Sequence, residues 1–305
     1  MNTYRNLIDH REFLKSLSAE QRVQLTQKTN QPAFVRLASI LCLHAIAIAC
    51  IVLRIPFWPL VIVFQGILLM CLFHLMHECI HATAFASKRI NRIVSVACGW
   101  FLFLPAQWFR HFHFAHHRHT QDVKNDPELA LRKPGNWVEW VLHVTGVLIW
   151  FASVKLFLSA LTGQNKDSFV PAESRSRVTR EIRLMMCGYA AVVFVSLITQ
   201  SALLFWIWIL PLGAGQPFLR LYLLAEHANC PNEGNMFVNT RTVFTHPVIR
   251  WLTWNMPYHT EHHVYPAAPF HKLPLLHQYM KKNLINTNNG YVEFNQTYTA
   301  AFKKS

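Results

Sequence analysis

The stretch FWPLVIVFQGILLMCLFHLMHECIHATAF, residues 57–85, is the most informative part of this 305-residue sequence. Its first twenty residues are apolar apart from Gln65 and His74, which is the length and composition of one membrane-spanning helix. The run ends in His77 and His81, which lie four residues apart and therefore on one face of a helix. The sequence thus predicts a span that delivers imidazole side chains to one surface of a membrane.

Other apolar blocks on both sides of this stretch are also long enough to cross a bilayer. Residues 37–53 predict a first span, joined to the second by the short break RIPFWP, and residues 184–226 carry no charge before Arg220 and predict two more. Prolines and glycines in the last block are expected to kink or unwind it, namely Pro211, Gly213, Gly215 and Pro217. The predicted fold class is an all-α integral membrane protein of about four transmembrane helices.

Two further apolar segments, 94–109 and 137–161, are interrupted and rich in Trp and His, which favours interfacial or re-entrant helices. No repeat or linker marks a second domain, so residues 1–305 are expected to form one. Its predicted parts are an N-terminal segment (1–33), paired transmembrane helices (34–76 and 184–226) and two catalytic parts (77–183 and 227–305).

Charge and cysteine content narrow the class of protein. The net charge is +14, but the basic residues flank apolar blocks instead of forming a stripe, which favours anionic lipid over nucleic acid. The two predicted outer turns carry only Arg54, so both termini and the long polar segments are expected on the cytoplasmic side. The seven cysteines contain no CxxC pair, and the first 30 residues have no secretory signal.

The 18 histidines include three clusters that predict a metal centre. HECIH is followed by HFAHH and later by HTEHH, so the HxxHH spacing occurs twice. Eight imidazoles exceed what one ion uses, and two ions are the economical inference. His227, in LLAEHANC, lies where the last span would re-emerge and is a ninth candidate. The predicted metal-ligating residues are His77, His81, His113, His116, His117, His227, His259, His262 and His263, and all except His227 are also the predicted catalytic residues.

Metal-bound imidazoles usually donate their other N–H to a carboxylate or a carbonyl group. The candidates for this outer role are Glu78, Asp122, Asp126, Glu226, Asn255 and Glu261. The remaining histidines near the clusters fall off the shared spacing: His74, His111 and His119 have no assigned role, and His246, His271 and His277 are expected to be structural or interfacial.

The three clusters and their order resemble the histidine-box superfamily of membrane fatty acid desaturases, with its relatives the alkane and carotenoid hydroxylases and ketolases. The resemblance covers roughly residues 35–280, with HFAHHRHTQDVKNDPEL similar to the second box and WNMPYHTEHHVYPAAPFHKLP to the third box of bacterial members. It implies two iron ions, O2 as co-substrate, and a four-span bundle capped by a cytoplasmic helical di-iron domain. His227 matches the extra ligand of such enzymes.

The resemblance further implies an oxidoreductase acting on an unactivated carbon–hydrogen bond of a lipid-like substrate. A fatty acid or acyl-lipid desaturase is the first expectation, and a hydroxylase of an acyl chain, alkane, terpenoid or small amphipathic metabolite is the alternative. The first box has the short HxxxH spacing and the HPGG signature of a fused cytochrome b5 domain is missing, which disfavours an acyl-CoA substrate. A separate electron donor is therefore expected, of the ferredoxin, rubredoxin or cytochrome b5 type with its reductase. The implied location is a bacterial inner membrane.

Two other classes of protein remain open from the sequence. HECIH also fits the HExxH pattern of a zinc hydrolase, with Glu78 as general base. A metal transporter would also carry histidines near spanning helices, although such proteins place ionisable residues inside the spans. The two HxxHH clusters argue against a mononuclear zinc site, because it would leave most of their imidazoles without a role.

Overall fold

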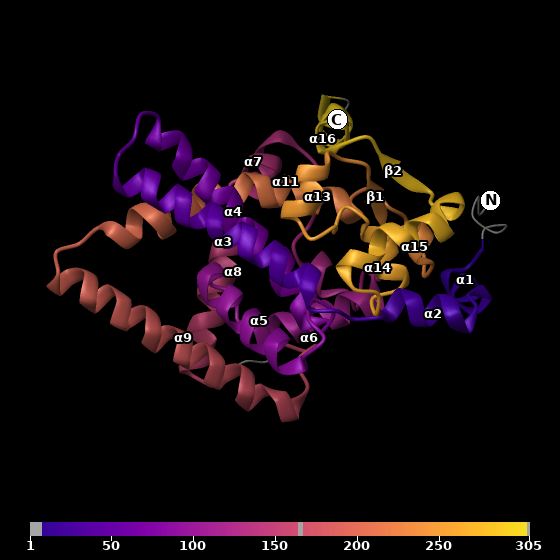
Figure 1. Cartoon of the computed structure of the whole chain (residues 1–305), viewed down its shortest axis with the longest axis horizontal. Coiled ribbons are helices and arrows are strands. Elements are labelled where there is room, and N and C mark those ends of the chain that lie inside the picture. The colour runs from indigo at the N-terminus through magenta and orange to yellow at the C-terminus, as the bar shows by residue number, and fades with distance from the viewer. Residues whose placement is uncertain (1–7, 164–166, 304–305) are drawn as a thin grey trace.

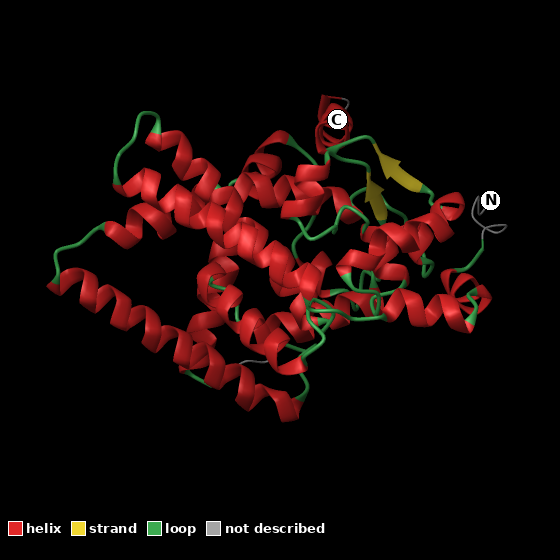
Figure 2. Cartoon of the chain, in the orientation of Figure 1, coloured by secondary structure: helices red, strands yellow, loops and turns green. Residues whose placement is uncertain are grey.

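The computed structural model describes residues 8–163 and 167–303, and these are almost entirely helical (Figure 2). The first half contains α1 (His10–Ser16), α2 (Ala19–Thr26), α3 (Gln31–Val52), α4 (Trp58–Ile80), α5 (Lys88–Leu102), α6 (Ala106–His119), η1 (Pro127–Ala130), α7 (Trp137–Val144) and α8 (Val147–Leu161). The second half contains α9 (Ala172–Ile198), η2 (Phe205–Ile209), α10 (Leu210–Ala214), α11 (Gln216–His227), α12 (Met236–Asn239), β1 (Arg241–Val243), α13 (Pro247–Leu252), α14 (His259–Val264), η3 (Phe270–Lys272), α15 (Leu273–Met280), η4 (Lys281–Asn283), β2 (Asn286–Asn288), α16 (Tyr291–Ala300) and η5 (Ala301–Lys303). The strands β1 and β2 are parallel and pair Arg241 with Asn286.

Four helical stretches are long and apolar enough to cross a membrane, as the sequence predicts: Ala19–Val52, Trp58–Ile80, Ala172–Ile198 and Phe205–His227. The chain is therefore an integral membrane protein. Two sharply bent pairs add up to two more candidate spans, since α5 and α6 meet at 99° and α7 and α8 at 55°. These pairs cover the segments that the sequence predicts to be interfacial or re-entrant.

Two of the spans begin earlier than the sequence predicts. The helix α3 starts at Gln31 and contains Arg36, whose guanidinium lies 4.4 Å from the Trp251 ring centroid and 4.7 Å from that of Phe270. These aromatic faces, which come from a distant part of the sequence, stabilise a charge that would otherwise be unfavourable in a buried position. The helix α9 starts at Ala172 because the arginines of its first turns are exposed, so they do not interrupt it.

The helix α4 lies at the centre of the bundle and contacts α3, α5, α10 and α11. Of its most apolar window 61% is buried, against 11% for α9, which lies along one edge of the molecule (Figure 1). One polar residue of α3 pairs with one of α4, because His44 Nδ1 lies 3.0 Å from Gln65 Oε1. Gln65 Nε2 also donates to Ile207 O at 3.3 Å.

The Ile207 carbonyl group lacks the usual helical donor, because Pro211, four residues later, has no N–H. The predicted irregularity of the last span is thus present as the π-helical turn η2 before the short helix α10, and as a second break at Gly215 before α11 begins at Gln216. The span nevertheless continues to His227 and places that residue at its end.

A cap of short helices covers one end of the bundle. The C-terminal elements α14, α15 and β2 gather there beside the N-terminal helices α1 and α2, opposite the turn between α3 and α4 (Figure 1). One hydrophobic cluster joins the two parts of the chain, with Phe13 and Leu25 packed among Phe237, Leu273 and Met280. The cap therefore holds α14 against the ends of α4 and α11.

Candidate metal centre

The first histidine cluster lies where α4 ends. His77 occupies its last turn and is 4% exposed, while His81 is the residue at its C-terminal cap. The two ring centroids lie 5.2 Å apart. Arg110 of α6 donates a hydrogen bond to the Ile80 carbonyl group, so the end of α4 is tied to the helix that carries the second cluster.

The second cluster lies on α6 and points in two directions. His113 and His117 are four residues apart and share one face of the helix, whereas His116 is displaced by about 100° from His117. The third cluster, on the short helix α14, has the same spacing, so His259 and His263 share a face and His262 is displaced. The paired histidines of α6 and those of α14 belong to different groups. Each helix therefore contributes imidazoles to two separate groups.

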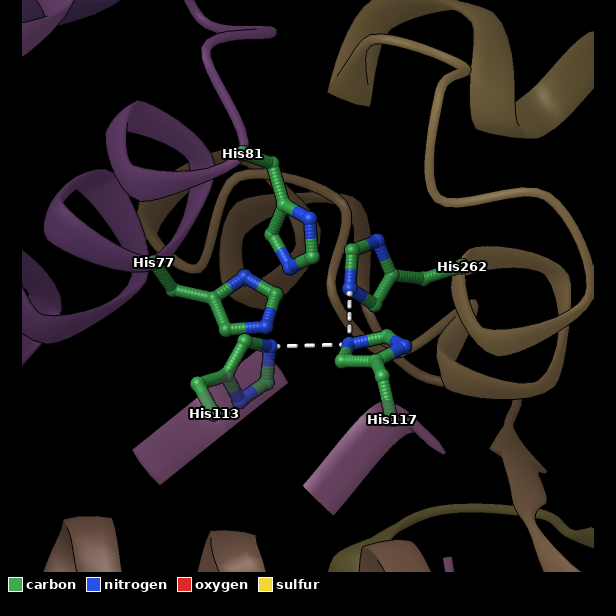
Figure 3. Close-up of side chains that lie close together, drawn as sticks. All are labelled: His77, His81, His113, His117 and His262. Carbon is green, nitrogen blue, oxygen red and sulfur yellow. Dashed lines mark hydrogen bonds between the residues drawn. The ribbon is translucent and has the colours of Figure 1, made fainter. Parts of the chain in front are cut away.

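The first group, called group A, contains five imidazoles whose ligand atoms all lie within 4.8 Å of one another: His77, His81, His113, His117 and His262. These side chains come from α4, α6 and α14 and point toward one another (Figure 3). His117 Nε2 lies 2.8 Å from His113 Nε2 and 3.1 Å from His262 Nε2.

The second group, called group B, contains four buried imidazoles under the same distance limit: His116, His227, His259 and His263. His227, at the end of α11, is central, since its Nε2 lies 3.1 Å from His116 Nε2 and 2.8 Å from His259 Nε2. The structure thus brings together all nine predicted metal-ligating histidines, five in one group and four in the other.

The donor atoms of both groups suit a cation. An imidazole nitrogen that carries a hydrogen has no lone pair with which to accept a hydrogen bond. In each group one central Nε2 atom contacts two others, and hydrogen bonds alone cannot satisfy all three. A metal ion can, and nitrogens about 2.1 Å from one ion lie roughly 3 Å apart. The buried Nε2 atoms of His81 and His263 have no hydrogen-bond partner among the described residues, which leaves them available to an ion.

The pKa values of most of these imidazoles are lowered, whereas the carboxylates of Glu128 and Asp126 raise the pKa of His116 against the effect of its burial. Burial, followed by the charge of neighbouring imidazoles, lowers the pKa of His262 and His263 well below the usual value for histidine. Burial has the same effect on the pKa of His81 and His259. Neutral imidazole is the form that binds metal, so these residues are ready to act as ligands at neutral pH.

Two of the six predicted outer residues contact the imidazoles of group B. Asp126 is 5% exposed, and its two carboxylate oxygens lie 3.0 and 3.1 Å from His116 Nδ1. Glu226 Oε1 lies 3.3 Å from His259 Nδ1. Asp126 holds the far nitrogen of the His116 ring, which leaves Nε2 as the lone-pair donor. Glu226 lies close to His259 Nδ1 without a hydrogen bond to it.

The other four predicted outer residues have partners outside both groups. Glu78 accepts hydrogen bonds from the Thr83 hydroxyl group and from Phe270 N. Glu261 lies between His277 Nδ1, at 2.5 Å, and the Thr242 hydroxyl group.

Asp122 is exposed and accepts hydrogen bonds from Lys124 N and the Asn125 amide group. Asn255 donates to Phe270 O at 3.0 Å. Glu78 thus ties η3 to the end of α4, and Asn255 ties it to the segment after α13.

Several contacts in the centre are absent from the sequence-based prediction. The His227 Nδ1–H group donates to Asn239 O at 3.1 Å, and the Thr120 hydroxyl group lies 3.3 Å from His263 Nδ1. Glu128 Oε2 lies 3.4 Å from His116 Nε2, the nitrogen that faces group B. The spacing of Thr120, one turn after His116, is the only signal in the sequence that could have pointed to these contacts.

The remaining histidines lie outside groups A and B. His74 is buried one turn before His77 and packs edge-on against Tyr222, with ring centroids 4.6 Å apart. His246 is exposed and caps α13 by accepting from Val248 N. The structure includes His111, His119, His271 and His277 in neither group.

Comparisons with known proteins agree with this geometry. The sequence profile of the fatty acid desaturase family matches residues 53–295, which is most of the chain. The chain is 24% identical over 206 residues to the sphingolipid delta(4)-desaturase/C4-monooxygenase DES2 of Rattus norvegicus, and equally to that of Mus musculus. The aligned region is 66% of this chain and 58% of each relative, so the match spans little more than half the length of these proteins.

Proposed function

The chain belongs to the fatty acid desaturase family, and from that premise we propose that it is an O2-dependent di-iron enzyme that desaturates the acyl chain of a membrane lipid. The observation that carries the proposal is the pair of histidine groups, five and four imidazoles, at the end of the central span. A single ion would leave about half of these donors unused.

In this proposal group A holds one iron ion and group B the other, through the nine histidines named above. When bound, the two irons supply the oxidation by O2 of an aliphatic carbon–hydrogen bond, which no protein base is strong enough to deprotonate. The chain itself holds the ligands, orients them and keeps the site dry. Asp126 fixes the ring of His116, Asn239 O fixes that of His227, and Glu226 lies beside His259.

The overall reaction balances with a separate reductant. The lipid segment –CH2–CH2– loses two hydrogens to become –CH=CH–, and O2 takes up these two hydrogens, two electrons and two protons to form two waters. We propose that the electrons come from a one-electron carrier protein of the ferredoxin, rubredoxin or cytochrome b5 type. Exposed arginines of α9, among them Arg175, Arg177 and Arg180, suit the docking of an acidic carrier.

We propose that the acyl chain approaches through a cavity beside the central span. The cavity lies between α4, α8 and α11 and is lined by Met70, Phe73, Trp150, Ser153, Leu219 and Arg220, among others. Phe73 also packs on Phe109, with ring centroids 5.2 Å apart, and Phe109 stacks on His113 of group A at 5.5 Å. These contacts connect an apolar cavity at the level of the spans to the histidine groups, as a lipid substrate requires.

The proposed placement in the membrane puts the cap, both histidine groups and the termini on the cytoplasmic side of a bacterial inner membrane. The distribution of lysine and arginine supports it, with Arg54 at the opposite end of the bundle. The whole chain then acts as one catalytic domain, since the N-terminal helices pack with the C-terminal third.

Hydroxylation is the second candidate reaction, and the names of the two relatives favour it because they include both desaturase and monooxygenase activities. The same reductant would then give an alcohol and one water. A zinc hydrolase is less well supported. Glu78, which would be its general base, has no exposed surface, and its Oε2 accepts hydrogen bonds from Thr83 and Phe270.

The metal content of the purified protein tests the proposal. We expect two irons per chain by elemental analysis and Mössbauer spectroscopy, and less iron in both His117→Ala and His262→Ala. The matched control is His246→Asn, an exposed histidine replaced by a residue that also caps helices, and it should keep both irons. Cells expressing the wild type should then contain lipids with new double bonds. One zinc per chain, unchanged in the variants, would contradict the proposal, and new hydroxyl groups would select the second reaction.

A further inference from the structure

We propose that Glu128 is a tenth metal ligand, which contributes a carboxylate oxygen to the ion of group B. The inference rests on the proposed di-iron function and adds a residue outside the nine histidines. Glu128 lies in η1, nine residues after the end of α6, and its side chain turns back toward His116.

The position of Glu128 is set by the same carboxylate that holds His116. Asp126 Oδ1 accepts a hydrogen bond from Glu128 N at 2.9 Å and lies 3.0 Å from His116 Nδ1. Asp126 Oδ2 also accepts from Gln121 N at 2.9 Å. The buried Asp126 side chain therefore orients the His116 ring through Nδ1. The same side chain also positions Glu128 near Nε2 of that ring.

With a neutral His116 ring, the contact between Glu128 and His116 needs a cation between the two side chains to be favourable. Because the His116 Nδ1–H group faces Asp126, Nε2 carries the lone pair in the neutral ring. That lone pair faces His227 Nε2 at 3.1 Å and Glu128 Oε2 at 3.4 Å. His227 donates its own proton to Asn239 O, so its Nε2 is also a lone-pair donor. Two imidazole lone pairs and a carboxylate oxygen thus converge, which is the donor set of a metal ion.

The second oxygen of Glu128 is engaged elsewhere, which leaves one oxygen for the ion. Lys133 Nζ donates to Glu128 Oε1 at 2.6 Å, so Oε2 is directed toward His116. Glu128 is not among the side chains of group B whose ligand atoms all lie within 4.8 Å of one another. It would therefore join the ion as a fifth donor from the side of His116, where its Oε2 lies 3.4 Å from Nε2.

Charge also distinguishes the two groups. Neutral imidazoles do not offset the charge of a divalent ion, and among the described residues no carboxylate contacts an imidazole of group A. Group B has contacts with Asp126, Glu226 and Glu128. A direct carboxylate ligand would make group B the more electron-rich site, so the two ions would not be equivalent.

The decisive variants are Glu128→Gln, which removes the negative charge at nearly constant size, and Lys133→Met, which breaks the same ion pair but keeps the carboxylate. The protein is loaded with iron-57, and iron per chain, Mössbauer spectra and retention against a competing chelator are measured. We expect Glu128→Gln to weaken the binding of one ion by at least about 10- to 100-fold, the range known for outer-shell partners, and to change one iron signal only. Lys133→Met should keep both ions.

Glu128→Asp keeps the charge but shortens the side chain, and it should weaken the same single ion. The exposed Glu12→Gln is the control and should match the wild type. Wild-type iron content, affinity and spectra in Glu128→Gln would overturn the assignment, as would equal loss of iron in Glu128→Gln and Lys133→Met. A wild type without two irons would instead refute the proposed function itself, before any variant is considered.

Discussion

The closest approach between spans gives a quantitative test of the fold. Gly66 of α4 faces Pro211 and Gly215, and a Cβ atom added to Gly66 would collide with Pro211 O and lie 2.7 Å from Gly215 N. Ordinary contact begins at 3.4 Å, so the contact with Gly215 N alone would require a separation of about 0.7 Å, and the collision with Pro211 O requires more. Gly66→Ala therefore tests whether the two helices pack as described.

The expected cost follows from two opposing effects. Overpacking a well-packed contact costs about 1–3 kcal/mol, whereas replacing glycine by alanine inside a helix gains about 0.5–1 kcal/mol. The net destabilisation of Gly66→Ala should be about 1–2 kcal/mol, which corresponds to a Tm lower by roughly 2–3 °C for a chain of this length. Gly213→Ala is the matched control, because nothing lies within 4 Å of its added Cβ atom and its Tm should be unchanged or higher.

Thermal unfolding in detergent, followed by tryptophan fluorescence, measures both variants. Because α10 leads into α11 and His227, we also expect Gly66→Ala to bind the ion of group B less tightly than the control does. Equal Tm values for Gly66→Ala and Gly213→Ala would refute the close contact between α4 and α10.

Three further predictions concern the metal centre and its surroundings. Asp126→Asn should weaken iron binding at group B about 10- to 100-fold in a chelator competition, because the carboxylate orients His116; full retention would contradict that role. Glu181 of α9 accepts hydrogen bonds from two N–H groups at the start of α6, so Glu181→Gln should lower the free energy of unfolding by about 0.5–2 kcal/mol. The exposed Glu173→Gln, also on α9, should leave it unchanged in thermal unfolding. Ser153→Trp should fill the proposed substrate cavity and lower the lipid product while iron content stays at the wild-type level, and undiminished product would exclude this route.

Much of the centre follows from the sequence because it depends on local helical geometry. A period of 3.6 residues puts His113 and His117 on one face, and the same spacing in HTEHH predicts a second helix of this kind. The apolar length before His77 predicts that the first cluster ends a span. These inferences need no knowledge of how the helices pack.

The outer residues were harder to predict because a carboxylate near a histidine in sequence can face away from it in space. Asp122 and Asp126 are four residues apart, yet Asp122 is exposed and Asp126 is buried against His116. Glu261 lies within the third cluster and contacts His277 instead of a clustered imidazole. Glu128 was not a candidate, because its approach to His116 depends on the turn of η1.

The sequence by itself therefore predicted the membrane class, the four long apolar helices and the nine histidines that gather in the two groups, since these rest on apolar length and helical period. Only the tertiary structure decided that His262 joins group A while His259 and His263 join group B, because that division depends on the angle at which α14 docks against α4 and α11. It also decided that Arg36 belongs to a spanning helix, because the aromatic rings that stabilise its charge, Trp251 and Phe270, come from residues more than 200 positions away. Local periodicity is encoded in neighbouring residues, whereas docking angles and long-range partners arise only when the whole chain packs.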